Sequence, residues 1–287
     1  MIIVHTIEEL KATVKKIKEL GKSIGLVPTM GYLHEGHLTL ASTARKENDF
    51  VIMSIFVNPT QFGPNEDFES YPRDLQRDSK LAESAGVDVV FAPSVEEMYP
   101  QDGGIRIRAG RQSELLCGAT RPGHFDGVLQ VVSKLFNITG PTRAYFGQKD
   151  AQQVAIIQTL VRDYNFPLEI RTVPIVREED GLAKSSRNIY LSEQDRKEAP
   201  AIYEALQIAK EHYLATKDAE KAKEIASGHI TTKTSGKIDY LEFLSYPDLK
   251  NVTNDTDQFL LATAVYIGKT RLIDNIIFSL KGEQANV

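Results

Sequence analysis

Two histidines, His34 and His37, stand three residues apart in the segment VPTMGYLHEGH, residues 27–37. This segment follows an apolar run of strand type and opens an amphipathic segment of helical type. A helix start favours an anion, and side chains three apart on a helix share one face, so both imidazoles could reach one phosphate. Gly36, between them, would leave room for a nucleotide. The pattern indicates stabilisation of charge during phosphoryl or nucleotidyl transfer.

These and similar residues allow other interpretations. The histidines could cap a helix start and face solvent. A zinc site has less support, because no third ligand of suitable type is nearby and the spacing is not HExxH. The segment 268–270, GKT, resembles the end of a Walker A loop, but Thr263 stands where that loop needs glycine, so we interpret it as a turn. No GxGxxG fingerprint follows a strand.

Three further clusters carry polar groups suited to a nucleotide or a small acid. Asn58 and Gln61, after the second strand-like run, offer uncharged donors and acceptors for hydroxyl and carboxylate groups. Lys149 stands where a helix opens, with Asp150 as its candidate N-cap, and suits a phosphate. The segment 181–188, GLAKSSRN, could clamp a polyphosphate with two hydroxyls and a guanidinium. Each cluster also has a plainer interpretation: a turn for the first, a solvated surface lysine for the second and a polar linker for the third. Together, the clusters favour one nucleotide-binding cleft.

A fold of alternating strands and helices is needed to position these clusters. We expect strands at 24–27, 50–57, 87–91, 143–146 and 168–173, and helices at 36–47, 73–85, 126–137 and 150–164. Such alternation predicts an α/β, Rossmann-like parallel sheet with helices on both faces. Ligands of these sheets bind beyond the carboxyl ends of the strands, which is where three of the clusters fall.

The pattern changes after residue 176. Charged helical patterns at 192–215 and 217–231 precede strand patterns at 237–245, 258–267 and 272–278. That order predicts a smaller α+β C-terminal domain with a short antiparallel sheet. We therefore expect one domain at 1–175 and a second at 176–287.

Composition bounds the class of protein. The chain has 287 residues, of which 41% are hydrophobic and 25% charged, which excludes a disordered or fibrous chain. The net charge is −5 and no long basic tract occurs, so no nucleic acid partner is expected. Cys117 is the only cysteine, so neither an internal disulfide nor a CxxC site can form. No apolar run approaches a membrane span and residues 1–20 lack a signal-peptide core, so we expect a cytoplasmic protein with no membrane partner.

Six segments occur together in one known family. They are PTMGYLHEGH (28–37), FVNPTQFGPNEDFESYPR (56–73), RPGHFDGV (121–128), YFGQKDAQQ (145–153), IVREEDGLAKSSRN (175–188) and RLIDN (271–275). In type and order they resemble the pantothenate synthetases, or pantoate–β-alanine ligases, whereas HxGH alone is shared across a wide nucleotidyltransferase superfamily that includes class I aminoacyl-tRNA synthetases. The resemblance implies that ATP and magnesium convert (R)-pantoate to pantoyl adenylate with release of pyrophosphate. β-Alanine then gives pantothenate and AMP, a step of coenzyme A biosynthesis.

The resemblance also implies roles for individual residues, with His37 as the proton-donating catalytic histidine. The catalytic set is His37, His34, Lys149, Ser185, Ser186 and Arg187. The ATP-binding set is Pro28, Thr29, Met30, Gly31, His34, Gly36, His37, Gly147, Gln148, Lys149, Asp150, Val176, Lys184, Ser185, Ser186 and Arg187. The substrate-binding set is Gln61, Gln153, Asn58 and Met30. No protein nucleophile is needed, because the pantoate carboxylate attacks the α-phosphorus.

The same resemblance implies a homodimer, with domain 1–175 binding ATP and pantoate and domain 176–287 acting as a lid. Two residues depart from the family pattern: Lys184, where many members have an apolar residue, and Gln148, where Glu is frequent. The magnesium ligands stay open; phosphates could hold the ion, with Asp78 or Asp150 contributing through water. A nucleotidyltransferase with another product and an ATP-binding regulatory protein with a degenerate site are the competing functions, and the intact motif residues argue against the second.

Overall fold

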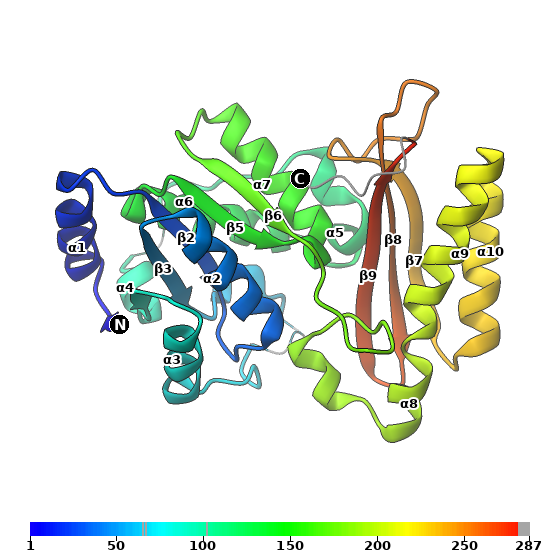
Figure 1. Ribbon diagram of the computed structural model, residues 1–287, viewed down its shortest axis with the longest axis horizontal. Coiled ribbons are helices and arrows are strands. Elements are labelled where there is room, and N and C mark those ends of the chain that lie inside the picture. Colours follow the sequence, from blue (N-terminus) through cyan, green and yellow to red (C-terminus); the bar gives the residue numbers. More distant parts are fainter. Residues whose placement is uncertain (65, 67, 102, 281–287) are drawn as a thin grey trace. The chain divides into compact units, whose positions relative to one another are not determined.

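The apolar runs of the first half of the chain form one six-stranded sheet in the computed structural model, which describes residues 1–64, 66, 68–101 and 103–280 (Figure 1). The strands are β1 (Ile2–Val4), β2 (Ile24–Thr29), β3 (Phe50–Ile55), β4 (Val89–Phe91), β5 (Arg143–Gly147) and β6 (Glu169–Val173). They pair in parallel in the order β1-β4-β3-β2-β5-β6. The chain leaves β2 toward β3 on one side and later returns to β5 on the other. Sheets of this kind bind ligands at such a switch point.

Helices cover both faces of this sheet. The helices up to residue 163 are α1 (Ile7–Glu19), α2 (Glu35–Glu47), α3 (Leu75–Ser84), α4 (Val95–Met98), α5 (Leu116–Thr120), α6 (His124–Thr139) and α7 (Ala151–Asp163), with short 3-10 turns η1 (Pro59–Gln61), η2 (Arg111–Glu114) and η3 (Gln148–Asp150). Val27 and Met53 pack into one cluster with side chains of α2 and α3. Leu26 and Ile52 point to the opposite face and are also fully buried. The expected α/β fold with helices on both faces is confirmed.

The last third of the chain forms a smaller helical and antiparallel part. It contains η4 (Ser186–Tyr190), α8 (Glu193–Glu198), α9 (Ala201–Thr216), α10 (Ala219–Lys233), β7 (Lys237–Ser245), β8 (Gln258–Ile267) and β9 (Thr270–Ser279). The sheet order is β7-β8-β9, so β9 is an edge strand. One sheet face packs on α9 and α10, and the other packs on Leu116, Ala151 and Ala155. The expected α+β part with a short antiparallel sheet is confirmed.

The structure differs locally from the expected elements. The single helical pattern at 192–215 is divided into α8 and α9 by Pro200, because proline lacks an N–H and its ring clashes with the preceding turn. Residues 268–269 form the tight turn between β8 and β9, with φ of 57° at Gly268, which confirms the interpretation of GKT as a turn.

Contacts group the residues into two compact units. Unit 1 comprises Met1–Glu114, Gly118–Gly147 and Ile156–Val173, and unit 2 comprises Leu115–Cys117, Gln148–Ala155 and Pro174–Val287. Unit 2 therefore includes two short segments from earlier in the chain. The domain limits at 175 and 176 and the lid role stay predictions.

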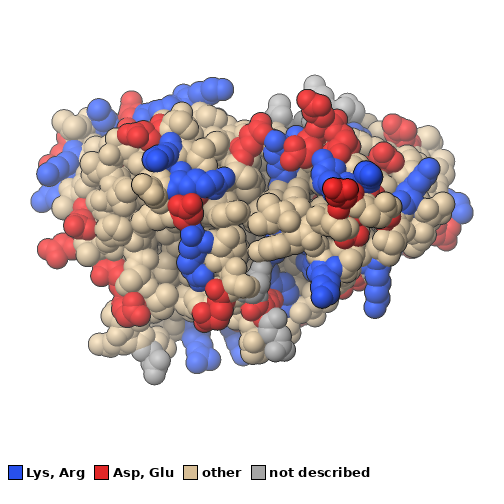
Figure 2. Space-filling view, turned by 90° about the horizontal axis from the view of Figure 1, so that it is seen from below, with Lys and Arg blue, Asp and Glu red and all other residues tan. Residues whose placement is uncertain are grey.

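The surface carries charge of both signs. On the face drawn in Figure 2, Lys and Arg side chains lie among Asp and Glu side chains, in keeping with totals of 34 basic and 39 acidic residues. Among the helices of the described residues, none is long and apolar enough to cross a membrane.

Candidate active site

The first turn of α2 holds the two histidines of the HxGH segment. His34 is the N-cap of α2 and His37 is its third residue. Nδ1 of His34 accepts the Gly36 N–H at 3.1 Å, and Nδ1 of His37 accepts the His34 N–H at 3.3 Å. The ring centroids lie 4.1 Å apart. Because both Nδ1 atoms accept hydrogen bonds, the neutral rings carry their protons on Nε2, so each ring is a donor at that atom.

Gly36 has a structural role that the sequence did not predict. A Cβ at this position would lie 2.9 Å from Cε1 and 3.0 Å from Nδ1 of His34. The absence of a side chain therefore makes room for the imidazole of His34. The expected close approach of a nucleotide at Gly36 stays a prediction. The glycine acts by allowing His34 to fold back over the helix start.

The turn before α2 has an unusual backbone that Asp78 holds in place. Gly31 and Tyr32 have φ values of 83° and 49°, and a residue other than glycine is strained in this region. Asp78 of α3 is 1% exposed and accepts the N–H groups of Tyr32 at 2.6 Å and Leu33 at 2.8 Å. Both carboxylate oxygens are thus engaged by the backbone. Asp78 positions the turn that leads to His34. A contact of Asp78 with magnesium through water stays a hypothesis.

Gln61 and Met30, two of the residues expected to bind substrate, lie in contact. Nε2 of Gln61 donates to Sδ of Met30 at 3.3 Å, and Oε1 of Gln61 accepts from Nδ2 of Asn58 at 3.1 Å. Asn58 is 1% exposed. Its Nδ2 also donates to the Gly127 carbonyl at 3.1 Å, and its Oδ1 accepts a hydrogen bond from the Tyr99 hydroxyl at 2.9 Å. Burial raises the pKa of Tyr99, so the hydroxyl keeps its proton. Asn58 therefore positions Gln61 in this structure. Its expected contact with substrate stays a prediction.

The segment 121–128, RPGHFDGV, supports the same turn, although no role was assigned to its residues from sequence. Nδ1 of His124 donates to the Gln61 carbonyl at 2.8 Å. A Cβ on Gly127 would lie 2.3 Å from the Thr60 carbonyl oxygen and 2.6 Å from the Gln61 nitrogen. Helix α6 can therefore approach η1 only because residue 127 is glycine. The presence of this segment among the family-like motifs was the one signal for its importance.

Apart from Gly147, the last residue of β5, the remaining expected ATP-binding residues lie on two segments of unit 2. One is η3, with Gln148, Lys149 and Asp150. The other runs from Val176, whose carbonyl accepts the Lys184 N–H at 2.9 Å, to η4. Ser185 caps η4, because its hydroxyl accepts the Arg187 N–H at 3.3 Å. Lys184, one of the departures from the family pattern, forms an ion pair with Glu178 at 3.3 Å.

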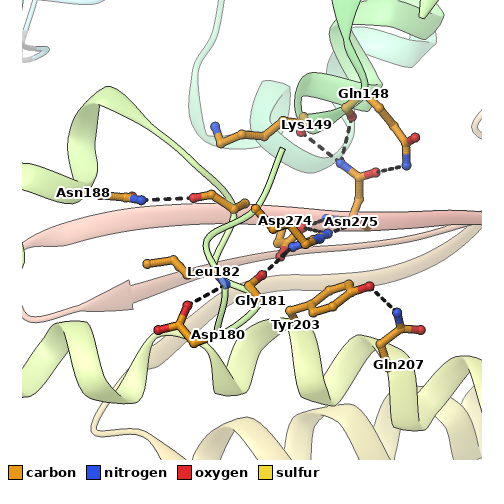
Figure 3. A network of polar contacts seen from close by, with 12 residues as sticks. Gln148, Lys149, Asp180, Gly181, Leu182, Asn188, Tyr203, Gln207, Asp274 and Asn275 are labelled. Atoms are coloured by element: carbon orange, nitrogen blue, oxygen red, sulfur yellow. Dashed lines mark hydrogen bonds and ion pairs between the residues drawn. The ribbon is translucent and has the colours of Figure 1, made fainter. Parts of the chain in front are cut away.

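Three residues without an assigned role connect these segments to β9 (Figure 3). Nδ2 of Asn275 donates to the Gln148 and Lys149 carbonyls at 3.0 and 2.9 Å. Arg177 binds Asp274 through two hydrogen bonds of 2.7 and 2.9 Å. Asp274 and Asn275 belong to the RLIDN segment, which was noted from sequence only as part of a resemblance.

The expected site residues thus fall into two groups. Unit 1 contains Pro28, Thr29, Met30, Gly31, His34, Gly36, His37, Asn58, Gln61 and Gly147. Unit 2 contains Gln148, Lys149, Asp150, Gln153, Val176, Lys184, Ser185, Ser186 and Arg187. Within the described residues, no group of three or more His, Cys, Asp and Glu side chains could hold a metal ion.

Comparison with known proteins gives a consistent result. Residues 2–277 match the family model described as Pantoate-beta-alanine ligase. The chain is 73% identical over 281 residues to a pantothenate synthetase of Lysinibacillus sphaericus, covering 98% of this chain and 99% of the relative. It is 55% identical over 275 residues to a pantothenate synthetase of Bacillus subtilis, covering 96% of each chain.

Solved structures agree in fold over the same length. The pantothenate synthetase of Thermus thermophilus superposes with a TM-score of 0.90 at 45% identity, covering 96% of this chain and 99% of that one. The pantoate-beta-alanine ligase of Francisella tularensis, complexed with beta-gamma ATP and beta-alanine, has a TM-score of 0.79 at 38% identity, covering 99% and 100%.

Proposed function

Because the chain belongs to the pantoate–β-alanine ligase family, we propose that it condenses (R)-pantoate with β-alanine to pantothenate, converting ATP to AMP and pyrophosphate. The observation that carries this proposal is the adjacent pair of imidazoles of His34 and His37 at the start of α2, after a central parallel strand. Two imidazole donors and the positive end of a helix suit the phosphates of a nucleotide.

The reaction needs no nucleophile from the protein. The pantoate carboxylate attacks the α-phosphorus of ATP and pyrophosphate leaves. The acyl carbon of the resulting adenylate carries AMP as its leaving group, whereas the free carboxylate would have to expel oxide. The β-alanine amine then attacks the acyl carbon, AMP leaves, and the amine loses a proton. The protein must hold two anions together and stabilise charge on the phosphate oxygens.

Unit 1 would supply the groups that stabilise this charge and hold pantoate. The Nε2–H groups of His34 and His37 would donate to phosphate oxygens, with His37 as the proton donor. Gln61, which His124 and Asn58 hold in position, would bind pantoate and line the β-alanine site. An amide side chain suits both a hydroxyl and a carboxylate, because it carries a donor and an acceptor.

Unit 2 would complete the site with cations. Lys149 and Arg187 would balance the charge of the triphosphate, since a guanidinium binds phosphate with two parallel hydrogen bonds and an ammonium acts as a point charge. Ser185 and Ser186 would donate hydroxyl hydrogen bonds, and Gln153, near the start of α7, would bind pantoate.

We propose that Mg²⁺ accompanies ATP instead of residing in a protein site. The ligand set of the described residues fits this role, because no cluster of three or more ligating side chains occurs and Asp78 is engaged by backbone N–H groups. Mg²⁺ keeps several waters and commonly binds through substrate phosphates. When bound, it would neutralise charge on the phosphates.

We also propose that the enzyme is a homodimer in the cytoplasm, as the family resemblance implies. The mass of one chain is 32.0 kDa, so a dimer would have twice this mass in light scattering after size exclusion. A single-chain mass over the micromolar range would refute the dimer.

Pyrophosphate and AMP release from ATP–Mg²⁺ tests the proposed reaction. With pantoate alone, we expect pyrophosphate; added β-alanine should then give AMP and pantothenate. A stable nucleotidylated product with no amine requirement would favour another nucleotidyltransferase. ATP binding with no release of pyrophosphate or AMP for this substrate pair would favour the regulatory protein. Each of these two results would refute the ligase function.

A further inference from the structure

Two adjacent residues of β9 point to opposite faces of the small sheet. Asp274 and Asn275 are 5% and 2% exposed, although β9 is an edge strand. Neighbouring residues of a strand alternate between the faces, and here each face carries a different partner. In Figure 3, Asn275 extends toward Gln148 and Lys149, whereas Tyr203 of α9 lies on the other side of the strand.

Asn275 fixes the backbone of η3 on one face. Its two amide hydrogens are both used, by the Gln148 carbonyl at 3.0 Å and the Lys149 carbonyl at 2.9 Å. Its Oδ1 lies 3.4 Å from Nε2 of Gln148. The interaction is with main-chain atoms, so it sets where η3 lies whatever the side chain at 148. The Cα of Lys149 is therefore tied to β9.

Asp274 fixes the start of the second segment on the other face. Its carboxylate receives two hydrogen bonds from Arg177, whose Nη1 also donates to the Gly181 carbonyl at 3.0 Å. The guanidinium lies 3.5 Å from the ring centroid of Tyr203. Gly181 has φ of 93°, and a Cβ there would lie 2.9 Å from Tyr203. The hairpin that leads to Ser185 is thus held by an ion pair, a ring and a glycine.

We propose that Asp274 and Asn275 are positioning residues that fix the spacing between Lys149 and the segment 185–187, and so prepare both for one nucleotide. This inference rests on the proposed function, which assigns both segments to ATP. Neither side chain needs to touch ATP. Two cations that are held at a fixed separation bind a polyphosphate without reorganising, whereas cations on loose segments lose affinity and alignment.

The test compares Asn275→Ala with Thr263→Val. Thr263 faces Asp274 across β8 and β9, is fully buried, and donates to the Tyr240 carbonyl at 2.8 Å, so its replacement removes a buried hydrogen bond of the same sheet without touching η3. We expect Asn275→Ala to weaken ATP binding, measured by titration calorimetry, by about 10-fold and to slow single-turnover adenylate formation by about 10- to 100-fold. Thr263→Val should leave both values within about 2-fold of the parent.

A second variant keeps the test informative if Asn275→Ala folds poorly. Asp274→Asn preserves the shape and one acceptor for Arg177 but removes the carboxylate charge. We expect it to raise the KM for ATP by about 10-fold while the KM for β-alanine is unchanged. A purely structural role would instead lower the active fraction, so that kcat falls and both KM values stay constant; that result would overturn the inference.

The two proposals fail separately. If the parent enzyme binds ATP but releases no pyrophosphate with pantoate, the ligase function is refuted, and the calorimetric comparison still tests the positioning role. If the parent is active and both β9 variants bind ATP as tightly as Thr263→Val does, the positioning role is refuted and the ligase function stands.

Discussion

Replacement of Asp78 by Asn should destabilise the turn that leads to the two histidines. The carboxylate accepts the N–H groups of Tyr32 at 2.6 Å and Leu33 at 2.8 Å, and it is 1% exposed. An amide has one oxygen, so one of these N–H groups would face an NH2 group and lose its acceptor. A buried donor without a partner costs about 1–3 kcal/mol, and the surviving bond loses its charge assistance, about 1 kcal/mol. We therefore expect a loss of about 2–4 kcal/mol in the free energy of unfolding.

Activity should fall as well as stability, because Tyr32 keeps its φ of 49° only while its N–H is held. Urea unfolding gives the free energy, and pyrophosphate release gives kcat. In a protein of this size we expect the melting temperature to fall by about 5–15 °C. We expect kcat to fall by about 10-fold or more, because the turn positions His34 at the helix start.

Asp74→Asn is the matched control. Asp74 is the N-cap of the same helix, accepting the Arg77 N–H at 3.0 Å, and Asn caps helices as well as Asp does. It should change the free energy of unfolding by less than about 0.5 kcal/mol. If Asp78→Asn is as stable and as active as Asp74→Asn, the argument that Asp78 holds the turn is wrong.

Three further changes test the site. His37→Ala should lower turnover by about 100- to 1,000-fold in single-turnover assays, and unchanged turnover would remove His37 from the mechanism. Gly127→Ala should displace η1, at a cost of about 1–3 kcal/mol, and raise the KM for pantoate because the new Cβ meets the Gln61 nitrogen at 2.6 Å; a normal KM would contradict this. The hydrogen-bonded Arg121 guanidinium lowers the pKa of Glu66 below its ordinary 4.5. The ion pair therefore stabilises the folded state fully above pH 4.5, and this stabilisation is lost as the pH falls through the lowered pKa. Glu66→Gln should therefore lower the free energy of unfolding at pH 7 by about 1 kcal/mol and by less near pH 3, whereas a pH-independent loss would show that packing is responsible.

Local patterns predicted the elements that carry the site. Strand-like runs at 24–27 and 143–146 correspond to β2 and β5, because buried parallel strands are continuous apolar runs whatever their neighbours. The histidine spacing predicted that both imidazoles could lie together, and their ring centroids are 4.1 Å apart. His34 is the extended N-cap, so the reciprocal capping contacts with the helix start bring the rings together instead of a shared helical face. These features depend on residues close in the sequence.

Features that depend on distant residues were not predictable in this way. The role of Asp78 as acceptor for residues 32 and 33 requires two elements that meet only in the folded sheet. Asn275 likewise contacts carbonyls more than 120 positions earlier. The buried hydrogen bonds of Asn58 to the Gly127 carbonyl and the Tyr99 hydroxyl likewise join residues that are distant in the sequence.

The composition of unit 2 has a consequence for how the chain can be made and recombined. Its second hydrophobic cluster is built from Leu116, Ala151 and Ala155 together with side chains of β7, β8 and β9. Those three residues are synthesised long before the strands that cover them, so the unit cannot mature until β7, β8 and β9 have been translated. For the same reason, a chimera that exchanges only residues 174–287 between relatives would separate the two halves of one core. A viable exchange would have to transfer 115–117 and 148–155 along with the C-terminal part.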